Sequence, residues 1–342
     1  MLKTAGHPLS ATREPAELLT PSEVRRLLAD HALAPRRSSG QNFVVDPNTV
    51  RRIVAHAEIG PADVVIEIGP GLGSLTVALA ERAQRVVAIE IDRGLVRALE
   101  EVLASRGSQI AERVEVIHAD ALNVDLATLV ERLTTGERAT ARECATAGEP
   151  PQAGSDAAGA EISPETDRQA ANVRVVANLP YNVATPLVMH ALESGAVDDM
   201  FVMVQREVGE RWIAEPGSRL RAGVSVKIDR MATAEIAMRI PRQVFHPVPN
   251  VDSVMVRLTR RREPDRLLDE MDRRRRWFDL IDAAFAQRRK TLRNAWSRSI
   301  DRDVLEQAAR RAGVDLGSRA EVLATDAFAA MFDALDGTRS SG

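Results

Sequence analysis

Apolar and polar residues along most of the chain alternate between strand patterns and helix patterns. Buried-strand patterns occur at residues 64–68, 85–91, 114–118 and 173–177, each a short run rich in Val, Ile and Ala. Helical spacing of apolar residues follows at 74–83, 92–105 and 186–193. Strands that alternate with helices predict a mostly parallel sheet covered by helices, so the sequence indicates an α/β fold.

The pattern changes toward the end of the chain. Further strands are predicted at 200–205, 224–228 and 254–258, the last two as an antiparallel, hairpin-like edge. From residue 264 onward the spacing is helical, at 267–286, 304–312 and 320–335. We therefore predict a Rossmann-like α/β domain over residues 20–260 and a small all-helical domain over 264–335.

Two segments fall outside these domains. We interpret residues 1–19 as a flexible tail that ends where Thr20, Pro21 and Glu23 form a capping-box pattern, which predicts a helix to about Leu33. Residues 134–172 are rich in Gly, Pro, Glu and Thr, and cannot bury enough apolar surface to offset the entropy of ordering. We interpret them as a disordered insertion without a catalytic part.

Composition excludes several classes of protein. Cys144 is the only cysteine, so no disulfide framework or thiolate metal cluster is expected, and the scattered histidines lack metal-ligand spacing. No stretch has the pattern of a signal peptide or a membrane span, which fits a cytoplasmic protein. The net charge is −3, but residues 257–298 hold fourteen Lys and Arg against seven Asp and Glu. That segment is expected to meet phosphate.

A glycine-rich loop follows the first strand of the sheet. Gly69 and Gly71 allow a tight turn and close approach of a nucleotide, although a plain strand-to-helix turn is an alternative. Glu67 would repel a pyrophosphate but suits the ammonium and sulfonium of S-adenosylmethionine (SAM). Glu90 is placed to accept both ribose hydroxyls of either ligand, and Asp120 could accept the adenine amino group or simply cap a turn.

The sharpest motif is Asn178-Leu179-Pro180-Tyr181, which follows the strand at 173–177. The N6 amine of adenine is a poor nucleophile because its lone pair is delocalised into the ring. The Asn178 side-chain oxygen and the Leu179 carbonyl can both accept hydrogen bonds from that amine and favour a tetrahedral nitrogen. Pro180 fixes the turn, and the Tyr181 ring can stack on an extruded base. A buried Tyr181 beside a simple turn is the structural alternative.

Two further segments each allow two interpretations. Phe245, which opens the proline-rich segment 245–253, forms either a second wall for the flipped base or part of the core before a strand. The basic run 288–294, with Trp277, Phe285 and Trp296 nearby, is expected on a helix. It is either a solvated face or a phosphate contact, and a base-modifying loop in the same chain favours the contact.

Together these motifs resemble the KsgA or RsmA family, the small-subunit ribosomal RNA adenine N6,N6-dimethyltransferases. Six motifs occur in the family's order, at residues 40–43, 67–71, 90–92, 178–181, 245–253 and 285–293. The resemblance implies a class I SAM-dependent methyltransferase domain. It also implies a SAM site lined by Asn42, Val44, Gly69, Glu90, Asp120 and Asn178, with Tyr181 and Phe245 holding the target base. We add Gly71 to the SAM site, and Arg288, Arg289, Lys290 and Arg293 as the RNA-contacting set.

The implied substrate is a pair of adjacent adenosines near the 3′ end of 16S ribosomal RNA, each methylated twice within a pre-assembled small subunit. We expect a monomer without a metal and without a membrane partner. The related Erm family, which methylates large-subunit RNA, is the nearest alternative, and the motif at 288–293 favours the small-subunit family. An inactive assembly or transcription factor on the same fold is a second alternative, against which intact Glu90, Asp120 and Asn178 argue. A nicotinamide-dependent oxidoreductase would leave residues 178–181 unexplained.

Overall fold

A seven-stranded sheet forms the centre of the α/β domain. The computed structural model describes residues 16–34, 41–136, 172–263, 265–287 and 289–339. The strand order is β4-β3-β2-β5-β6-β9-β7, and the first five strands are parallel. The strands are β2 (Val64–Ile68), β3 (Arg85–Glu90), β4 (Val114–His118), β5 (Val173–Asn178), β6 (Asp199–Gln205), β7 (Ala232–Ile240) and β9 (Ser253–Arg260). The predicted parallel α/β sheet is confirmed.

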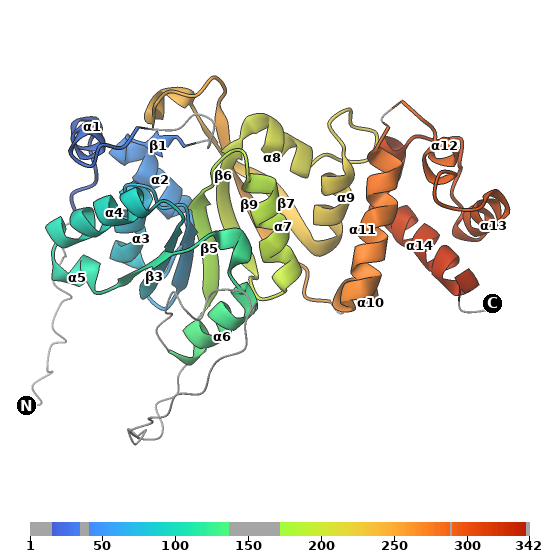
Figure 1. Cartoon of the computed structure of the whole chain (residues 1–342), viewed down its shortest axis with the longest axis horizontal. Helices are drawn as coiled ribbons and strands as arrows, with labels where there is room; N and C mark the ends of the chain where they lie inside the picture. The colour runs from blue at the N-terminus through green and yellow to red at the C-terminus, as the bar shows by residue number, and fades with distance from the viewer. Residues whose placement is uncertain (1–15, 35–40, 137–171, 264, 288, 340–342) are drawn as a thin grey trace, which may run out of the picture.

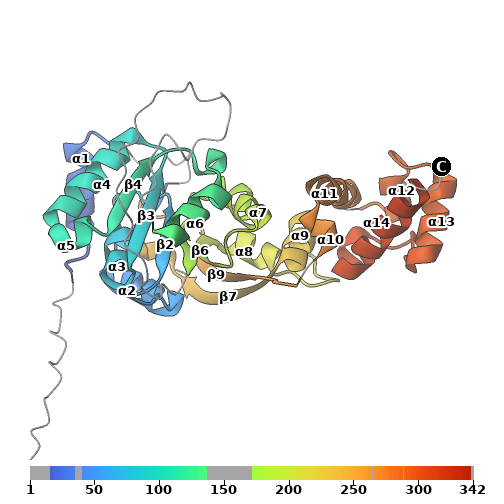
Figure 2. The same cartoon turned by 90° about the horizontal axis from the view of Figure 1, so that it is seen from below.

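Helices cover both faces of the sheet (Figures 1 and 2). One face is covered by α2 (Pro47–Ala57), α3 (Ser74–Arg82) and α4 (Arg93–Ser105), and the other by α6 (Leu126–Thr135) and α7 (Ala184–Ser194). Val65 packs into the first layer and its neighbour Ile66 into the second, because successive strand residues point to opposite faces. This double burial explains why the strands are almost continuously apolar.

The segment before the first helix packs against the α/β core. Helix α1 (Pro21–Asp30) has the predicted capping box between Thr20 and Glu23. Leu18 and Leu19 are only 3% and 2% exposed, so the flexible-tail interpretation is wrong for the end of the segment 1–19. These two leucines bury apolar surface against the same cluster as α1, which stabilises an ordered chain there. Residues 1–15 lie outside the described ranges.

The strand predicted at 224–228 is instead helix α9 (Gly223–Met231). Val224, Val226 and Ile228 alternate with polar residues and so imitate a strand. In the structure Val226 packs into the helical domain while Ile228 packs against the sheet, so this helix is buried on two sides. The closing strands are β7 and β9, which pair antiparallel, and β9 contains the predicted strand 254–258.

The C-terminal domain is helical, as predicted. It contains α10 (Arg266–Asp269), α11 (Met271–Phe285), α12 (Leu292–Trp296), α13 (Arg302–Ala312) and α14 (Thr325–Arg339). Trp277, Trp296 and Phe328 are fully buried in its core. Shorter elements elsewhere are β1 (Phe43–Val44), α5 (Ser108–Ala111), η2 (Ala121–Asn123), α8 (Arg206–Trp212), η3 (Arg242–Val244), β8 (Phe245–His246) and η4 (Ala320–Val322).

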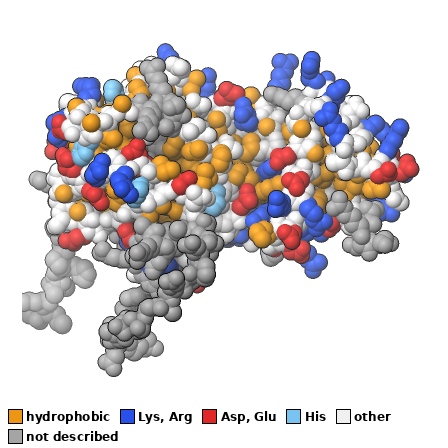
Figure 3. All heavy atoms as spheres, in the orientation of Figure 1, with side chains coloured by type: hydrophobic (Ala, Val, Ile, Leu, Met, Phe, Trp, Pro, Cys, Tyr) orange, Lys and Arg blue, Asp and Glu red, His pale blue; other side chains and the backbone are white. Residues whose placement is uncertain are grey.

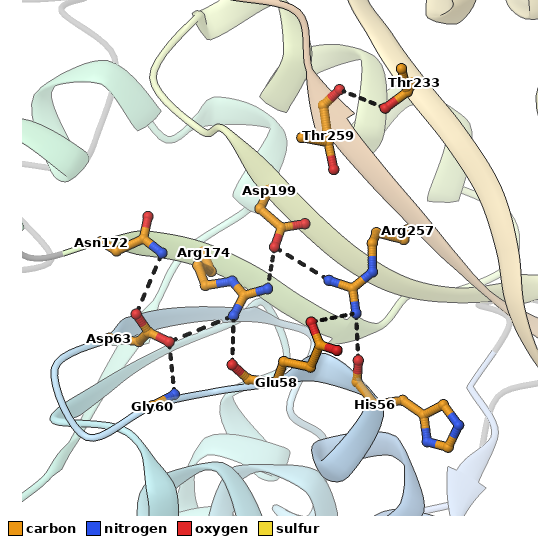
Figure 4. Close-up of polar contacts among 10 residues, drawn as sticks. All are labelled: His56, Glu58, Gly60, Asp63, Asn172, Arg174, Asp199, Thr233, Arg257 and Thr259. Atoms are coloured by element: carbon orange, nitrogen blue, oxygen red, sulfur yellow. Dashed lines mark hydrogen bonds and ion pairs between the residues drawn. The ribbon is translucent and has the colours of Figure 1, made fainter.

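Charged side chains tie helix α2 to the amino ends of β5 and β6 (Figure 4). The Arg174 guanidinium donates to the Glu58 carbonyl at 3.0 Å and pairs with Asp199. Arg257 also pairs with Asp199 and donates to the His56 carbonyl. Two arginines from distant strands therefore satisfy carbonyls at the end of α2 that have no partner within the helix.

Candidate active site

The candidate site lies where the strand order reverses. Strands β3 and β5 flank β2 on opposite sides, and ligands of open α/β sheets bind beyond the carboxyl ends of the strands at such a switch point. A cavity of about 450 Å³ opens there. The structure brings all seven predicted cofactor residues to its lining: Asn42, Val44, Gly69, Gly71, Glu90, Asp120 and Asn178.

The glycine loop needs its glycines for both backbone conformation and space. Gly69 and Gly71 have positive φ angles of 70° and 58°. A Cβ atom at Gly71 would lie 2.8 Å from the Phe43 ring, and one at Gly69 would lie 3.4 Å from Pro180. The loop therefore packs closely between β1 and the motif at 178–181, which keeps its main chain at the cavity wall.

Glu67 is a buried acid that lines the same cavity. Only 1% of it is exposed, and its Oε2 atom has no hydrogen-bond partner among the described residues. Burial, with a smaller contribution from the neighbouring charge of Glu90, raises the pKa of Glu67 to about 8, although the nearby Thr76 hydroxyl acts to lower it. An unsatisfied buried oxygen is costly, so this atom fits a ligand that brings a cationic donor. The methionine ammonium of SAM is such a donor.

Two other acids line the cavity. Glu90, at the end of β3, accepts hydrogen bonds from the Gly71 amide at 3.2 Å and from the Asp92 amide at 3.0 Å. Burial raises the pKa of Glu90 above its ordinary value. Asp120 caps the η2 turn by accepting from the Leu122 amide at 3.0 Å and also lines the cavity, so both interpretations of Asp120 are compatible with its position.

The motif at 178–181 begins at the carboxyl end of β5. Asn178 is half-buried, and its Nδ2 atom donates to the Asn42 carbonyl at 2.8 Å. With the nitrogen engaged, the amide presents its oxygen as the remaining polar atom. The Leu179 amide donates to the Met203 carbonyl at 3.2 Å, which ties the loop to β6. Asn178 and Leu179 both line the cavity.

A second cavity of about 480 Å³ adjoins the first, and Asn42 and Asn182 line both. Tyr181 lines this second cavity, and its hydroxyl lies 2.6 Å from the Oγ atom of fully buried Ser253. Burial raises the pKa of Tyr181, so the phenol stays neutral at physiological pH. The hydrogen bond fixes one end of the ring, which leaves a ring face available for stacking.

Phe245 does not line either cavity, which favours its core interpretation over a base-binding one. It is 2% exposed, pairs with Val44 in the β1–β8 sheet and packs in the first core cluster. The residues after it line the second cavity instead, from Pro247 to Val251. Strand pairing with β1 turns the ring into the core, and a sequence pattern cannot reveal that pairing.

The basic motif is divided between a turn at Arg289 and Lys290 and the start of helix α12, which contains Arg293. Helix α11 ends at Phe285 and α12 starts at Leu292, so Arg289 and Lys290 project from the connection and are exposed. Arg293 pairs with Glu306 of α13. Arg288 lies outside the described residues. Lys and Arg side chains gather around the α11–α12 end of the molecule on the face drawn in Figure 3. Trp277 and Trp296 are core residues and are not part of this surface.

Several lining residues escaped sequence reasoning. Ile91 follows Glu90 and is 62% exposed at the first cavity, where an apolar side chain suits the face of a nucleobase. Asn182 lies between the cavities, and Gln205 at the end of β6 lines the second one. The signal available was position at the ligand-binding edge. Ile91 and Gln205 are the last residues of the predicted strands 85–91 and 200–205, and Asn182 directly follows the motif at 178–181.

The described ranges contain neither a candidate membrane span nor a candidate metal site. No helix there combines the length and apolar character needed to cross a bilayer. No cluster of three or more His, Cys, Asp or Glu side chains there has the arrangement of a metal site.

Known proteins resemble this chain over most of its length. The family profile described as "Ribosomal RNA adenine dimethylase" matches residues 33–337. "Ribosomal RNA small subunit methyltransferase A" of Thermobifida fusca is 42% identical, over 92% of this chain and 95% of that protein. The protein of the same name from Moorella thermoacetica is 40% identical, over 91% and 96%.

Solved structures agree on the fold. A dimethyladenosine transferase from Plasmodium falciparum has a TM-score of 0.60 at 20% identity, covering 87% of this chain and 98% of that one. The 23S rRNA methyltransferase ErmE has a TM-score of 0.54 at 26% identity, covering 86% and 99%. The fold is that of class I SAM-dependent methyltransferases with a helical C-terminal region, and this chain belongs to the ribosomal RNA adenine dimethylase family.

Proposed function

We propose that this chain transfers methyl groups from SAM to the N6 atoms of two adjacent adenosines near the 3′ end of small-subunit ribosomal RNA, giving N6,N6-dimethyladenosine. The observation that carries the proposal is the junction of the two cavities. Asn178 lines the first, Tyr181 lines the second, and Asn42 and Asn182 line both. Such an arrangement brings a cofactor and a flipped base together at one wall.

The cofactor is S-adenosylmethionine, which supplies an electrophilic methyl group on its sulfonium. In the proposal Glu90 accepts hydrogen bonds from the ribose hydroxyls, Asp120 from the adenine amino group, and Glu67 from the ammonium. The loop at Gly69 and Gly71 lets the main chain approach closely. The unpartnered Oε2 atom of Glu67 supports this assignment.

The target amine is held by acceptors. The hydrogen bond from Asn178 to Asn42 orients the amide so that Oδ1 can accept from N6, and the Leu179 carbonyl accepts the second N–H. Both bonds strengthen as the nitrogen becomes tetrahedral, so they favour the transition state over the ground state. Tyr181 stacks on the base, and orientation supplies much of the rate without a covalent enzyme intermediate.

The small-subunit substrate is preferred over the large-subunit one because the relatives at 40–42% identity carry small-subunit names. In the proposal the substrate is a pre-assembled small subunit in the cytoplasm, and the enzyme acts as a monomer.

The experiment is transfer of labelled methyl from SAM to under-methylated small subunits and, separately, to large subunits, with digestion to nucleosides. We expect dimethyladenosine from small subunits alone. Label in large subunits would support the Erm-like alternative. No transfer by a folded chain that binds SAM would support an assembly factor without activity.

A further inference from the structure

The second cavity contains a polar side chain that the mechanism above leaves unused. Gln205 ends strand β6, is half-buried and lines the cavity together with Tyr181 and Asn182. Its Cα pairs with that of Ser253, the residue that holds the Tyr181 hydroxyl. Gln205 therefore lies on the strand pair that positions the stacking ring.

Local structure does not account for the Gln205 amide. The residue occupies the N-cap position of α8, where Asn, Asp, Ser and Thr are preferred and Gln is not. Its side chain makes no capping hydrogen bond, and it has no other hydrogen bond among the described residues. The amide therefore carries a donor and an acceptor that are available to a ligand.

The strand register places Gln205 close to the reacting position. Asn178 of β5 pairs with Met203 of β6, so Gln205 lies two residues farther along β6, at the same carboxyl edge. Side chains two residues apart on a strand share a face. Gln205 thus lies just beyond the level at which Asn178 would meet the target amine.

Adenine recognition needs more than acceptors for N6. Asn178 and Leu179 would accept equally from any exocyclic amine, including that of cytosine. In adenine the amine is flanked by two ring acceptors, N1 and N7. Cytosine has an equivalent of N1 in its N3 but a C–H on the other side of its amine, so only N7 distinguishes the two bases, and a side-chain amide can donate to it. Assuming the proposed function, we propose that Gln205 determines base specificity by donating a hydrogen bond from its side-chain amide to N7 of the flipped adenine.

The test compares wild type, Gln205→Ala and Gln205→Glu in single-turnover transfer at saturating SAM. Substrates are reconstituted small subunits with adenosine, 1-deazaadenosine or 7-deazaadenosine at the methylated position. On adenosine we expect Gln205→Ala to be roughly 10–100-fold slower, because the base is misoriented. Gln205→Glu should be at least as slow, because a carboxylate cannot donate. On 7-deazaadenosine wild type should slow to the rate of Gln205→Ala, and the two should become equal. On 1-deazaadenosine the ratio of wild type to Gln205→Ala should stay as it is on adenosine.

Gln243→Ala is the matched control, since Gln243 is exposed and lines neither cavity. SAM affinity by calorimetry should be the same in all variants, because Gln205 does not line the first cavity. An unimpaired Gln205→Ala rate on adenosine, or an unchanged ratio of wild type to variant on 7-deazaadenosine, would overturn the inference. Inactive wild type on adenosine would instead count against the proposed function.

Discussion

The side chain of Asn178 donates a hydrogen bond to the main-chain oxygen of Asn42 over 2.8 Å. The two residues are 136 positions apart, and they join the carboxyl end of β5 to the loop that enters β1. Because the bond uses the amide nitrogen, it selects the orientation in which the amide oxygen remains available to accept from the target amine. An amide that rotated freely would present a donor to the target amine half of the time.

Asn178→Ala should therefore abolish methyl transfer while keeping the fold. We expect a fall in the single-turnover rate of roughly 100-fold or more, the scale seen when one preorganised transition-state partner is removed. Asn178→Asp should also be slow, because its carboxylate would face the Asn42 carbonyl without a proton to donate. Rates are measured on under-methylated small subunits, with unfolding curves as the control. Transfer by Asn178→Ala at the wild-type rate would refute its role.

We predict that Glu67 releases a proton when SAM binds. Its pKa of about 8 in the free protein means that it is mostly protonated at pH 7. An ammonium beside it favours the carboxylate, so binding should release about one proton at pH 7. Calorimetry in buffers of different ionisation enthalpy measures this number. We expect SAM affinity to weaken as pH falls below 8, and we expect Glu67→Gln to abolish the proton release.

The raised pKa of Glu67 should also make the stability of the free protein depend on pH. The folded-state pKa of Glu67 lies above its ordinary value of 4.5, so folding favours the neutral form. The stabilisation of the folded state that comes from keeping Glu67 neutral is complete below about pH 4.5 and disappears as pH rises through 8. Glu67→Gln should therefore gain stability relative to wild type as pH increases across this window. Denaturant unfolding without SAM measures the difference, and parallel pH profiles would contradict the assignment.

Phe245 and Val248 should behave differently, although the same segment carries both. Phe245 is a core residue, so Phe245→Ala should lower the free energy of unfolding by about 3–5 kcal/mol. Val248 is 53% exposed and lines the second cavity. Val248→Ser should change stability by less than about 0.5 kcal/mol. If Val248 packs against the base, the substitution should raise the KM for small subunits by about tenfold. An unchanged KM would remove Val248 from the binding wall.

The fold was largely predictable because the local patterns and the tertiary structure agree. Strands β2, β3, β5 and β6 are apolar runs buried on both faces, and the helices between them have one apolar side. Helix α9 was mispredicted because Val226 and Ile228 face two different cores, which gives a period of two in a helix. Leu18 and Leu19 were not predicted as core residues because two adjacent leucines show neither helical nor strand periodicity.

The candidate site was predictable where chemistry requires specific residue types in sequence, as at Gly69, Glu90 and Asn178. It was less predictable where position depends on pairing between distant segments. Phe245 turns inward because β8 pairs with β1, and Gln205 reaches the second cavity because β6 pairs with β9. Neither pairing can be recognised from the local sequence. The three-dimensional structure was therefore needed to assign Phe245 to the core and Gln205 to the cavity.

The network around Arg174 should stabilise the protein strongly. Arg174 is buried and contacts the Glu58 carbonyl, Asp63 and Asp199. Arg174→Ala should cost about 3–5 kcal/mol, because it removes a buried guanidinium and leaves two half-buried acids with fewer partners. Arg26→Ala is the control, since the exposed Arg26–Asp30 pair should contribute less than about 0.5 kcal/mol. Denaturant unfolding compares the two, and equal destabilisation would show that the network adds nothing beyond a surface pair.

Arg289 and Lys290 are the best candidates for binding phosphate in the basic turn. Both are exposed, whereas Arg293 is paired with Glu306 and has part of its charge neutralised. Removing one cation that binds a phosphate should reduce the slope of log affinity against log salt by about 0.7–0.9. The double variant Arg289→Ala, Lys290→Ala should therefore lower that slope by about 1.5 in small-subunit binding. Arg293→Ala should lower it less, because its guanidinium already has a carboxylate partner. Identical slopes for wild type and the double variant would mean that the turn does not meet RNA, and that the local excess of positive charge serves pairing within the protein.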